Sequence, residues 1–206
     1  FFNENKDWLI PYAAFSYLRD KYDTSDFRKW KTCSVYNEEQ IHKLTSPAQK
    51  HYDKIAVQYF TQFNLHIQLR EAHEKKKKNG VIVKGDIPIG INRNGVDAWM
   101  SPELYYMDQQ AGAPPDDFAV KGQNWGFPTN KKKKMQEDGF TWWKRRFEQM
   151  SRYFDTFRID HILGFFRIWS IPENAIEGIM GHFVPSIPLQ INEFHQRNIW
   201  FDHERY

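Results

Sequence analysis

The chain has 206 residues, of which 40% are hydrophobic and 17% aromatic. This length can bury a sizeable core, but a complete α/β barrel takes about 250 residues. Two tetralysine runs, Lys75–Lys78 and Lys131–Lys134, produce the formal charge of +3, because without their eight charges 21 basic residues face 26 acidic ones. Both runs are isolated, as in solvated helix ends or loops. Nucleic-acid binding needs basic residues spread over one face, so we expect no nucleic-acid partner.

Cys33 is the single cysteine, which excludes a disulfide within the chain and fits a reducing compartment. The sequence has no zinc-binding spacing, and no apolar stretch approaches the roughly 20 residues of a membrane span. The first residues lack the pattern of a signal peptide and an initiator Met. We therefore expect a cytoplasmic protein without metal or membrane contacts, of which this chain is a piece.

The first 45 residues carry short, aromatic-rich helical patterns. Ser46-Pro47 then predicts the start of a long helix, and Asn79-Gly80 predicts its end, with a lysine run in the last turn. The apolar stripe of this helix repeats every fourth residue, at Ile55, Tyr59, Phe63 and Ile67. A short apolar strand follows from Val81 to Gly85 and finishes at Asp86.

The order of helix and strand recurs further along the chain. A helix is predicted from Thr141 to Phe154, a strand over Phe157–Asp160 and another strand near Phe166–Ile171. Alternating helices and short apolar strands indicate a parallel sheet, of which the barrel is the most populous closed form. Catalytic residues lie at the carboxyl ends of barrel strands, where Asp86 and Asp160 both fall. Residues 91–130 are expected to form a long, ordered loop, and the pattern weakens after residue 172.

The segment Arg158-Ile159-Asp160-His161 carries the most chemistry. Side chains alternate along a strand, so Arg158 and Asp160 should share one side, where the guanidinium would keep the carboxylate ionised. An ionised carboxylate beside an arginine and a histidine suits the nucleophile of a glycosidic-bond enzyme. The alternative is that Arg158 and Asp160 form an ordinary structural ion pair.

Several segments together resemble the 4-alpha-glucanotransferases, also called amylomaltases or disproportionating enzymes (glycoside hydrolase family 77), and in particular the maltose-using branch. The matching segments are Lys84-Gly85-Asp86-Ile87-Pro88-Ile89-Gly90, Val96-Asp97-Ala98-Trp99, Ser101-Pro102-Glu103-Leu104, Gly112-Ala113-Pro114-Pro115-Asp116, Gly122-Gln123-Asn124-Trp125-Gly126-Phe127-Pro128 and Phe157 to Trp169.

The resemblance implies an α-amylase-like (β/α)8 TIM barrel, truncated on its C-terminal side, with a retaining mechanism and no cofactor. Residues 1–172 would belong to the catalytic barrel, and residues 173–206 would start an insertion within it. The substrates would be maltose, maltodextrins and branched α-glucans of the starch and glycogen kind. The acid/base glutamate and a third carboxylate would lie beyond this chain. The 206 residues alone would then be inactive and would need the remainder of their own catalytic domain.

The resemblance also implies roles for individual residues. Asp160 matches the nucleophile, Arg158 the arginine that orients it, and His161 a histidine that binds sugar hydroxyls. Asp86 matches a carboxylate at the end of an earlier barrel strand. The remaining candidates for substrate contacts are Trp99, Asp116 and Trp125, the last two in a loop that borders the acceptor path. For both tryptophans the alternative is ordinary loop packing.

Two other functions remain open. A non-catalytic α-glucan-binding protein could keep the barrel and lose the chemistry, and an α-glucan hydrolase could use the same barrel. A downstream strand ending in glutamate would argue against the first, and lengthened products would argue against the second.

Overall fold

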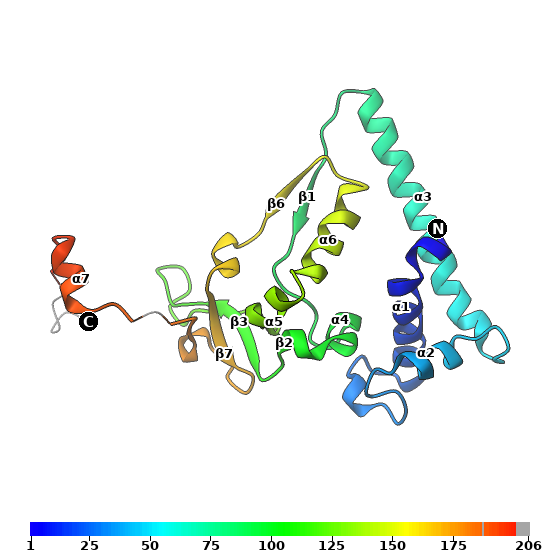
Figure 1. The fold of residues 1–206 in the computed structure, drawn as a ribbon, viewed down its shortest axis with the longest axis horizontal. Helices are drawn as coiled ribbons and strands as arrows, with labels where there is room; N and C mark the ends of the chain where they lie inside the picture. Colours follow the sequence, from blue (N-terminus) through cyan, green and yellow to red (C-terminus); the bar gives the residue numbers. More distant parts are fainter. Residues whose placement is uncertain (187, 201–206) are drawn as a thin grey trace.

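The computed structural model describes residues 1–186 and 188–200 and shows an α/β fold of long helices beside short strands (Figure 1). The helices α1 (Phe2–Tyr22) and α3 (Tyr52–Lys78) pack against each other, and the short α2 (Glu38–Leu44) packs on α1. The aromatic patterns of the first residues thus belong largely to one continuous helix, which passes through a buried Pro11.

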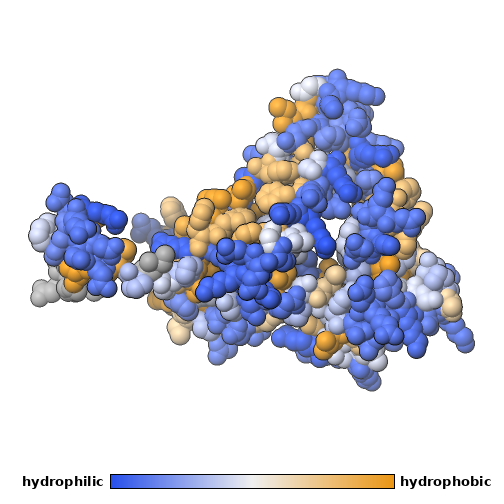
Figure 2. All heavy atoms as spheres, in the orientation of Figure 1, coloured by the Kyte–Doolittle hydropathy of each residue, from blue (hydrophilic) through white to orange (hydrophobic). Residues whose placement is uncertain are grey.

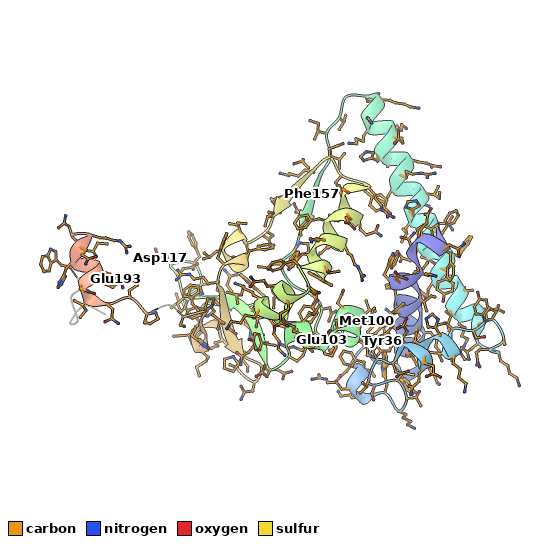
Figure 3. All side chains as sticks on the ribbon, in the orientation of Figure 1. Tyr36, Met100, Glu103, Asp117, Phe157 and Glu193 are labelled. Atoms are coloured by element: carbon orange, nitrogen blue, oxygen red, sulfur yellow. The ribbon has the colours of Figure 1, made fainter. Side chains whose placement is uncertain are left out.

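A parallel pair of strands stands beside these helices. β1 (Lys84–Ile87) pairs in parallel with β6 (Thr156–Ile159), and α6 (Thr141–Ser151) lies alongside them (Figure 1). Phe157 lies where β6 faces α6 (Figure 3), and its ring centroid is 5.9 Å from that of Phe147. The structure confirms both predicted strands and the helix before β6. β1, however, begins at Lys84 rather than at Val81.

The third predicted strand has a different partner. β7 (Ile168–Pro172) is antiparallel to β3 (Gln109–Ala113), within a four-stranded sheet of order β4-β3-β7-β8. The prediction of a third parallel strand was therefore wrong. A short apolar run has the same appearance in either orientation, because the direction of pairing depends on a partner far away in the sequence. The other strands of this sheet are β4 (Gln123–Asn124) and β8 (His182–Val184).

Residues 91–130 form more regular structure than a loop. They include all of β3 and β4 and a small antiparallel pair, in which β2 (Tyr105–Tyr106) pairs with β5 (Thr129–Asn130). The remaining helical elements of the described chain are η1 (Phe27–Lys29), α4 (Val96–Met100), η2 (Pro102–Leu104), α5 (Lys132–Glu137), η3 (Ile162–Phe165), η4 (Gly178–Met180) and α7 (Ile191–Gln196). α7, which carries Glu193, stands away from the rest at the end of an extended segment (Figures 1 and 3).

The long helix begins later than its sequence indicated. Ser46 accepts hydrogen bonds from the backbone of Gln49 and Ala48 in a separate turn, and α3 starts only at Tyr52. Its predicted stripe is buried only near its start, since Ile55 is fully buried while 41% of Phe63 is exposed. The predicted end is confirmed, because Asn79 caps the helix.

Not every lysine of the two tetralysine runs is solvated. In the first run, Lys76 pairs with Asp155, and only 10% of the Lys76 side chain is exposed. In the second run, the amino group of Lys132 is buried without a hydrogen-bond partner among the described residues. The expectation that both runs are solvated is therefore wrong for these two lysines.

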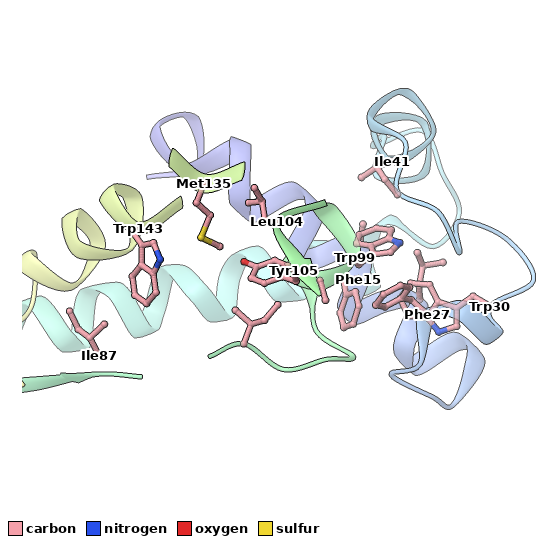
Figure 4. Close-up of a cluster of buried hydrophobic side chains, with 14 residues drawn as sticks. Phe15, Phe27, Trp30, Ile41, Ile87, Trp99, Leu104, Tyr105, Met135 and Trp143 are labelled. Carbon is pink, nitrogen blue, oxygen red and sulfur yellow. The ribbon is translucent and has the colours of Figure 1, made fainter. Parts of the chain in front are cut away.

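The main core lies between α1, α4 and α6 and continues to β1 (Figure 4). Trp99 and Trp30 meet edge to face at 5.8 Å in its centre, and Phe15 contacts both rings. At the other end, Trp143 and Ile87 join the parallel strands to this core (Figure 4). The C-terminal half of β1 is thereby anchored to the helices.

Apolar side chains also reach the surface beside the parallel strands. Figure 2 shows an apolar region over β6 and η3, where Ile159, Ile162, Leu163 and Phe166 are all more than 40% exposed. β6 pairs on one side only within the described residues, so this apolar edge of the sheet is open.

Candidate active site

Asp86 and Arg158 meet at the carboxyl ends of the parallel strands. The strand register pairs these residues directly, and a nitrogen of the Arg158 guanidinium donates to an Asp86 carboxylate oxygen at 2.7 Å. More than half of each side chain is exposed. Arg158 forms no ion pair with Asp160 among the described residues, so the expected arginine–aspartate pair exists with a different aspartate. Asp86 lies opposite Arg158 on the neighbouring strand and pairs with it, whereas Asp160, two residues further along the chain, does not.

Asp160 and His161 follow β6 immediately. The backbone N–H of Asp160 donates to the carbonyl of Ile87 at 3.3 Å, which extends the contact between the strands by one residue. His161 has a left-handed backbone (φ 52°), and its carbonyl accepts the N–H of Gly164 at the start of η3. The chain therefore turns sharply after Asp160, and both side chains line one pocket.

This pocket has a volume of about 460 Å³ and is bounded by three loops. Trp125 places its ring edge-on to His161 at 4.9 Å and stacks on Phe127 at 5.9 Å. The indole N–H of Trp125 donates to Gln123 at 3.0 Å, which fixes the orientation of the ring. The lining residues are Pro88, Ile89, Gly90, Ile91, Trp125, Phe127, Asp160 and His161. The site thus combines a carboxylate, an imidazole and aromatic faces, a composition suited to sugars.

Gly90 and Phe127 contribute to this pocket, although sequence reasoning did not select them. A Cβ at Gly90 would lie 2.2 Å from the Phe127 ring, so only glycine allows this loop and ring to approach. Both residues occur in the motif segments of the sequence. Neither carries a functional group, so a search for reactive side chains passes over them.

Three of the predicted substrate residues, Asp86, Trp99 and Asp116, are not among the residues that line this pocket. Trp99 is 1% exposed in the core, and its indole N–H donates to the Cys33 carbonyl at 2.9 Å. Asp116 is exposed, and its carboxylate accepts the backbone N–H groups of Phe118 and Ala119, at 2.9 and 2.6 Å. Trp99 therefore packs in the core, as the alternative of ordinary packing predicted. Asp116 stabilises a turn through its two backbone hydrogen bonds.

The described glutamates nearest the C-terminus are occupied elsewhere. Glu173 pairs with Arg93 at 3.5 Å, and Glu177 pairs with Lys121 at 2.5 Å. Glu193 closes a capping box at the start of α7. None of them lines the pocket of Asp160, so Asp160 is the one carboxylate among the described residues that line it.

Among residues 1–186 and 188–200, no set of three or more His, Cys, Asp or Glu side chains is arranged to hold a metal ion. Within the same residues, no helix combines the length and the apolar character needed to cross a bilayer.

A carboxylate at the carboxyl end of a parallel strand, in a pocket walled by aromatic rings, is typical of carbohydrate-active α/β enzymes. The family model described as 4-alpha-glucanotransferase, of glycoside hydrolase family 77, matches residues 1–199. The chain belongs to this family.

Individual relatives agree with the family model. The chain is 48% identical to "4-alpha-glucanotransferase DPE2" of Oryza sativa subsp. japonica, over 97% of this chain and 21% of that protein. It is 30% identical to the 4-alpha-glucanotransferase of Chlamydia trachomatis, over 88% of this chain and 33% of that protein. The chain thus spans a fifth to a third of the length of these relatives.

A solved structure also resembles the chain. The amylomaltase from Streptococcus agalactiae, in complex with acarbose, superimposes with a TM-score of 0.80 at 27% identity, over 90% of this chain and 38% of that one. The fold therefore agrees with the family that the sequence indicates.

Proposed function

We propose that the protein containing this chain transfers glucosyl or maltooligosyl units between α-1,4-glucans by a retaining double displacement. The observation that carries this proposal is the position of Asp160, at the carboxyl end of β6 and in one pocket with His161 and Trp125. In the first step, the Asp160 carboxylate attacks the anomeric carbon and forms a glycosyl ester while the leaving oxygen takes a proton. In the second step, an acceptor hydroxyl attacks the same carbon and releases Asp160.

The neighbouring residues have supporting roles in this proposal. His161 and Trp125 meet edge to face at 4.9 Å, which would let the imidazole bind a sugar hydroxyl while the indole face stacks on a sugar ring. Arg158 is held by its ion pair with Asp86 and would supply a positive charge near Asp160, which directly follows β6. Asp116 would act indirectly by shaping the loop on the acceptor side. Trp99 would support the site only from the core.

The proposed architecture is part of an α-amylase-like (β/α)8 barrel. β1 and β6 are parallel neighbours, and a helix precedes each of them, as in consecutive strands of such a barrel. The open apolar edge of β6 would pair with a further strand of the same catalytic domain, which we propose as the partner of this chain. Residues 1–172 would belong to the barrel, and residues 173–206 would begin an insertion, part of which lies outside the described residues.

Completion of the site requires a general acid/base. A retaining enzyme places this group about 5–5.5 Å from the nucleophile, and its loss typically costs 10²–10⁴-fold in rate. Since the described residues offer none at the pocket, we expect the 206 residues alone to be inactive. Maltose, maltodextrins and branched α-glucans are the proposed substrates. The amylomaltase–acarbose complex supports a sugar site in this fold.

The cytoplasmic location also remains a proposal. It rests on the single cysteine of the chain, which fits a reducing compartment. The compartment varies within the family, because the relative from Solanum tuberosum is named chloroplastic/amyloplastic.

A product assay on the intact protein tests the activity. The intact protein is incubated with maltose plus glycogen and, separately, with maltotriose alone. Glucose together with lengthened glucans, lost in Asp160→Asn and retained in the exposed control Asp20→Asn, is the expected result. Glucose without chain growth would indicate a hydrolase. An intact protein that binds maltodextrin without turnover would be a binding protein.

A further inference from the structure

A second pocket, of about 180 Å³, lies behind the wall of the Asp160 pocket and shares Ile89 with it. It is formed where β5 and α5 meet α6 and η3. Most of its lining is apolar or aromatic and comprises Ile89, Met135, Phe140, Trp143, Phe147 and Phe165. None of the proposed steps of glucosyl transfer uses this pocket.

Two polar groups lie within this apolar lining without partners. The amino group of Lys132 and the side-chain carbonyl of Asn130 both line the pocket, are buried and form no hydrogen bond among the described residues. Buried polar groups are nearly always hydrogen-bonded, so two such atoms at one pocket indicate a missing partner. One is a donor and the other an acceptor.

Lys132 also lacks a counter-charge. No ion pair of the described residues includes it, and desolvation by its surroundings is what lowers the pKa of Lys132. The neighbouring lysines are satisfied differently: Lys131 lies over the Tyr106 ring at 5.3 Å, and Lys134 pairs with Glu137 at 2.8 Å. Lys133 is exposed to solvent. Lys132 is therefore the lysine of this run whose amino group a bound ligand could pair with.

The size and lining of the pocket define the ligand. Burying a cation without a partner is unfavourable, and a carboxylate at hydrogen-bond distance offsets that cost. The aromatic side chains around Lys132 suit a flat apolar body, and the volume suits a single ring. We propose that the Lys132 pocket binds a small monocarboxylate with an aromatic or short aliphatic body. Its carboxylate accepts from the Lys132 ammonium, and a hydroxyl on the ligand, or a water molecule, donates to Asn130.

The test uses the intact protein and 4-fluorobenzoate, observed by fluorine NMR during a titration. Saturable binding is expected, weakened at least tenfold in Lys132→Met and unchanged in the control Lys133→Met. Lys132→Met keeps an unbranched side chain that is one atom shorter and removes its charge. A second variant, Lys132→Gln, keeps a polar end without the charge and should lose binding in the same way if Lys132→Met does not fold.

Other results of the same experiment would overturn the proposal. The neutral analogue 4-fluorobenzyl alcohol should bind at least tenfold more weakly, so equal binding of the alcohol would exclude pairing with Lys132. Displacement of 4-fluorobenzoate by maltotriose would place it in the Asp160 pocket instead. No saturable binding to the unmodified protein, or equal binding to Lys132→Met, would likewise reject the pocket as an anion site. The outcome is independent of the product assay, because binding is measured without turnover.

Discussion

The Arg158 guanidinium donates to the Asp86 carboxylate at 2.7 Å across the register that joins β6 to β1. The bond connects residues on two strands that a long stretch of chain separates. It fixes the arginine at the carboxyl end of the strands, two residues before Asp160, the proposed nucleophile. Asp86 is thereby a positioning residue in the proposed mechanism.

Asp86→Asn should therefore affect activity more than stability. More than half of each side chain is exposed, and exposed ion pairs contribute about 0–1 kcal/mol, so the free energy of unfolding should fall by less than about 1 kcal/mol. The value of kcat for glucosyl transfer should fall at least tenfold, because the arginine loses its anchor. Chemical unfolding and the transfer assay on the intact protein check this, with Arg158→Lys as the matched change. A large loss of stability with unchanged kcat would instead support the ordinary structural ion pair.

The two tryptophans should respond in opposite ways. Trp99 is 1% exposed within the core, so Trp99→Ala should reduce the free energy of unfolding by about 3–5 kcal/mol. Trp125 lines the pocket, so Trp125→Ala should cost much less stability and should raise KM for the glucan. Thermal unfolding and transfer kinetics separate these effects. Normal KM in Trp125→Ala would remove this ring from the proposed sugar site.

Gly90→Ala should disturb the pocket by collision with one ring. The added Cβ would meet Phe127 at 2.2 Å, and overpacking of this kind costs about 1–3 kcal/mol. The double variant Gly90→Ala/Phe127→Ala should relieve the collision, so its loss of stability should be smaller than the sum of the two single losses. Additive losses in a double-mutant cycle would show that the close approach is unimportant.

Tyr59 should make stability depend on pH in the alkaline range. Burial raises the pKa of Tyr59 from its ordinary value of 10.0 to about 12, so the folded protein holds the phenol proton more tightly than the unfolded chain. This contribution is fully present below pH 10 and is lost as the pH rises toward 12.

The comparison with Tyr59→Phe isolates that contribution. Phenylalanine keeps the ring that packs edge-on against Phe2 at 4.9 Å and removes the titrating group. Unfolding in denaturant should show the unmodified protein losing stability relative to Tyr59→Phe between pH 10 and 12. Parallel curves across that range would show that Tyr59 is not perturbed by folding.

The sequence by itself determined the local parts of this protein. Short-range patterns indicated β1, α6 and β6, and the position of Asp160 at a strand end followed from alternation and chain order. The motif segments around Asp86 and Asp160 also indicated the family. All of these features depend on residues close together in the chain, where spacing and propensity act directly.

The tertiary structure alone decided the contacts between distant segments. The register between β1 and β6 places Arg158 opposite Asp86, so the arginine forms its ion pair with Asp86 rather than with Asp160. The pairing of β7 with β3 is antiparallel. Burial separated Trp99 from Trp125 and removed the amino group of Lys132 from solvent. Identical residue types thus received different environments, because burial and pairing depend on which remote surfaces pack together, and no local pattern encodes that choice.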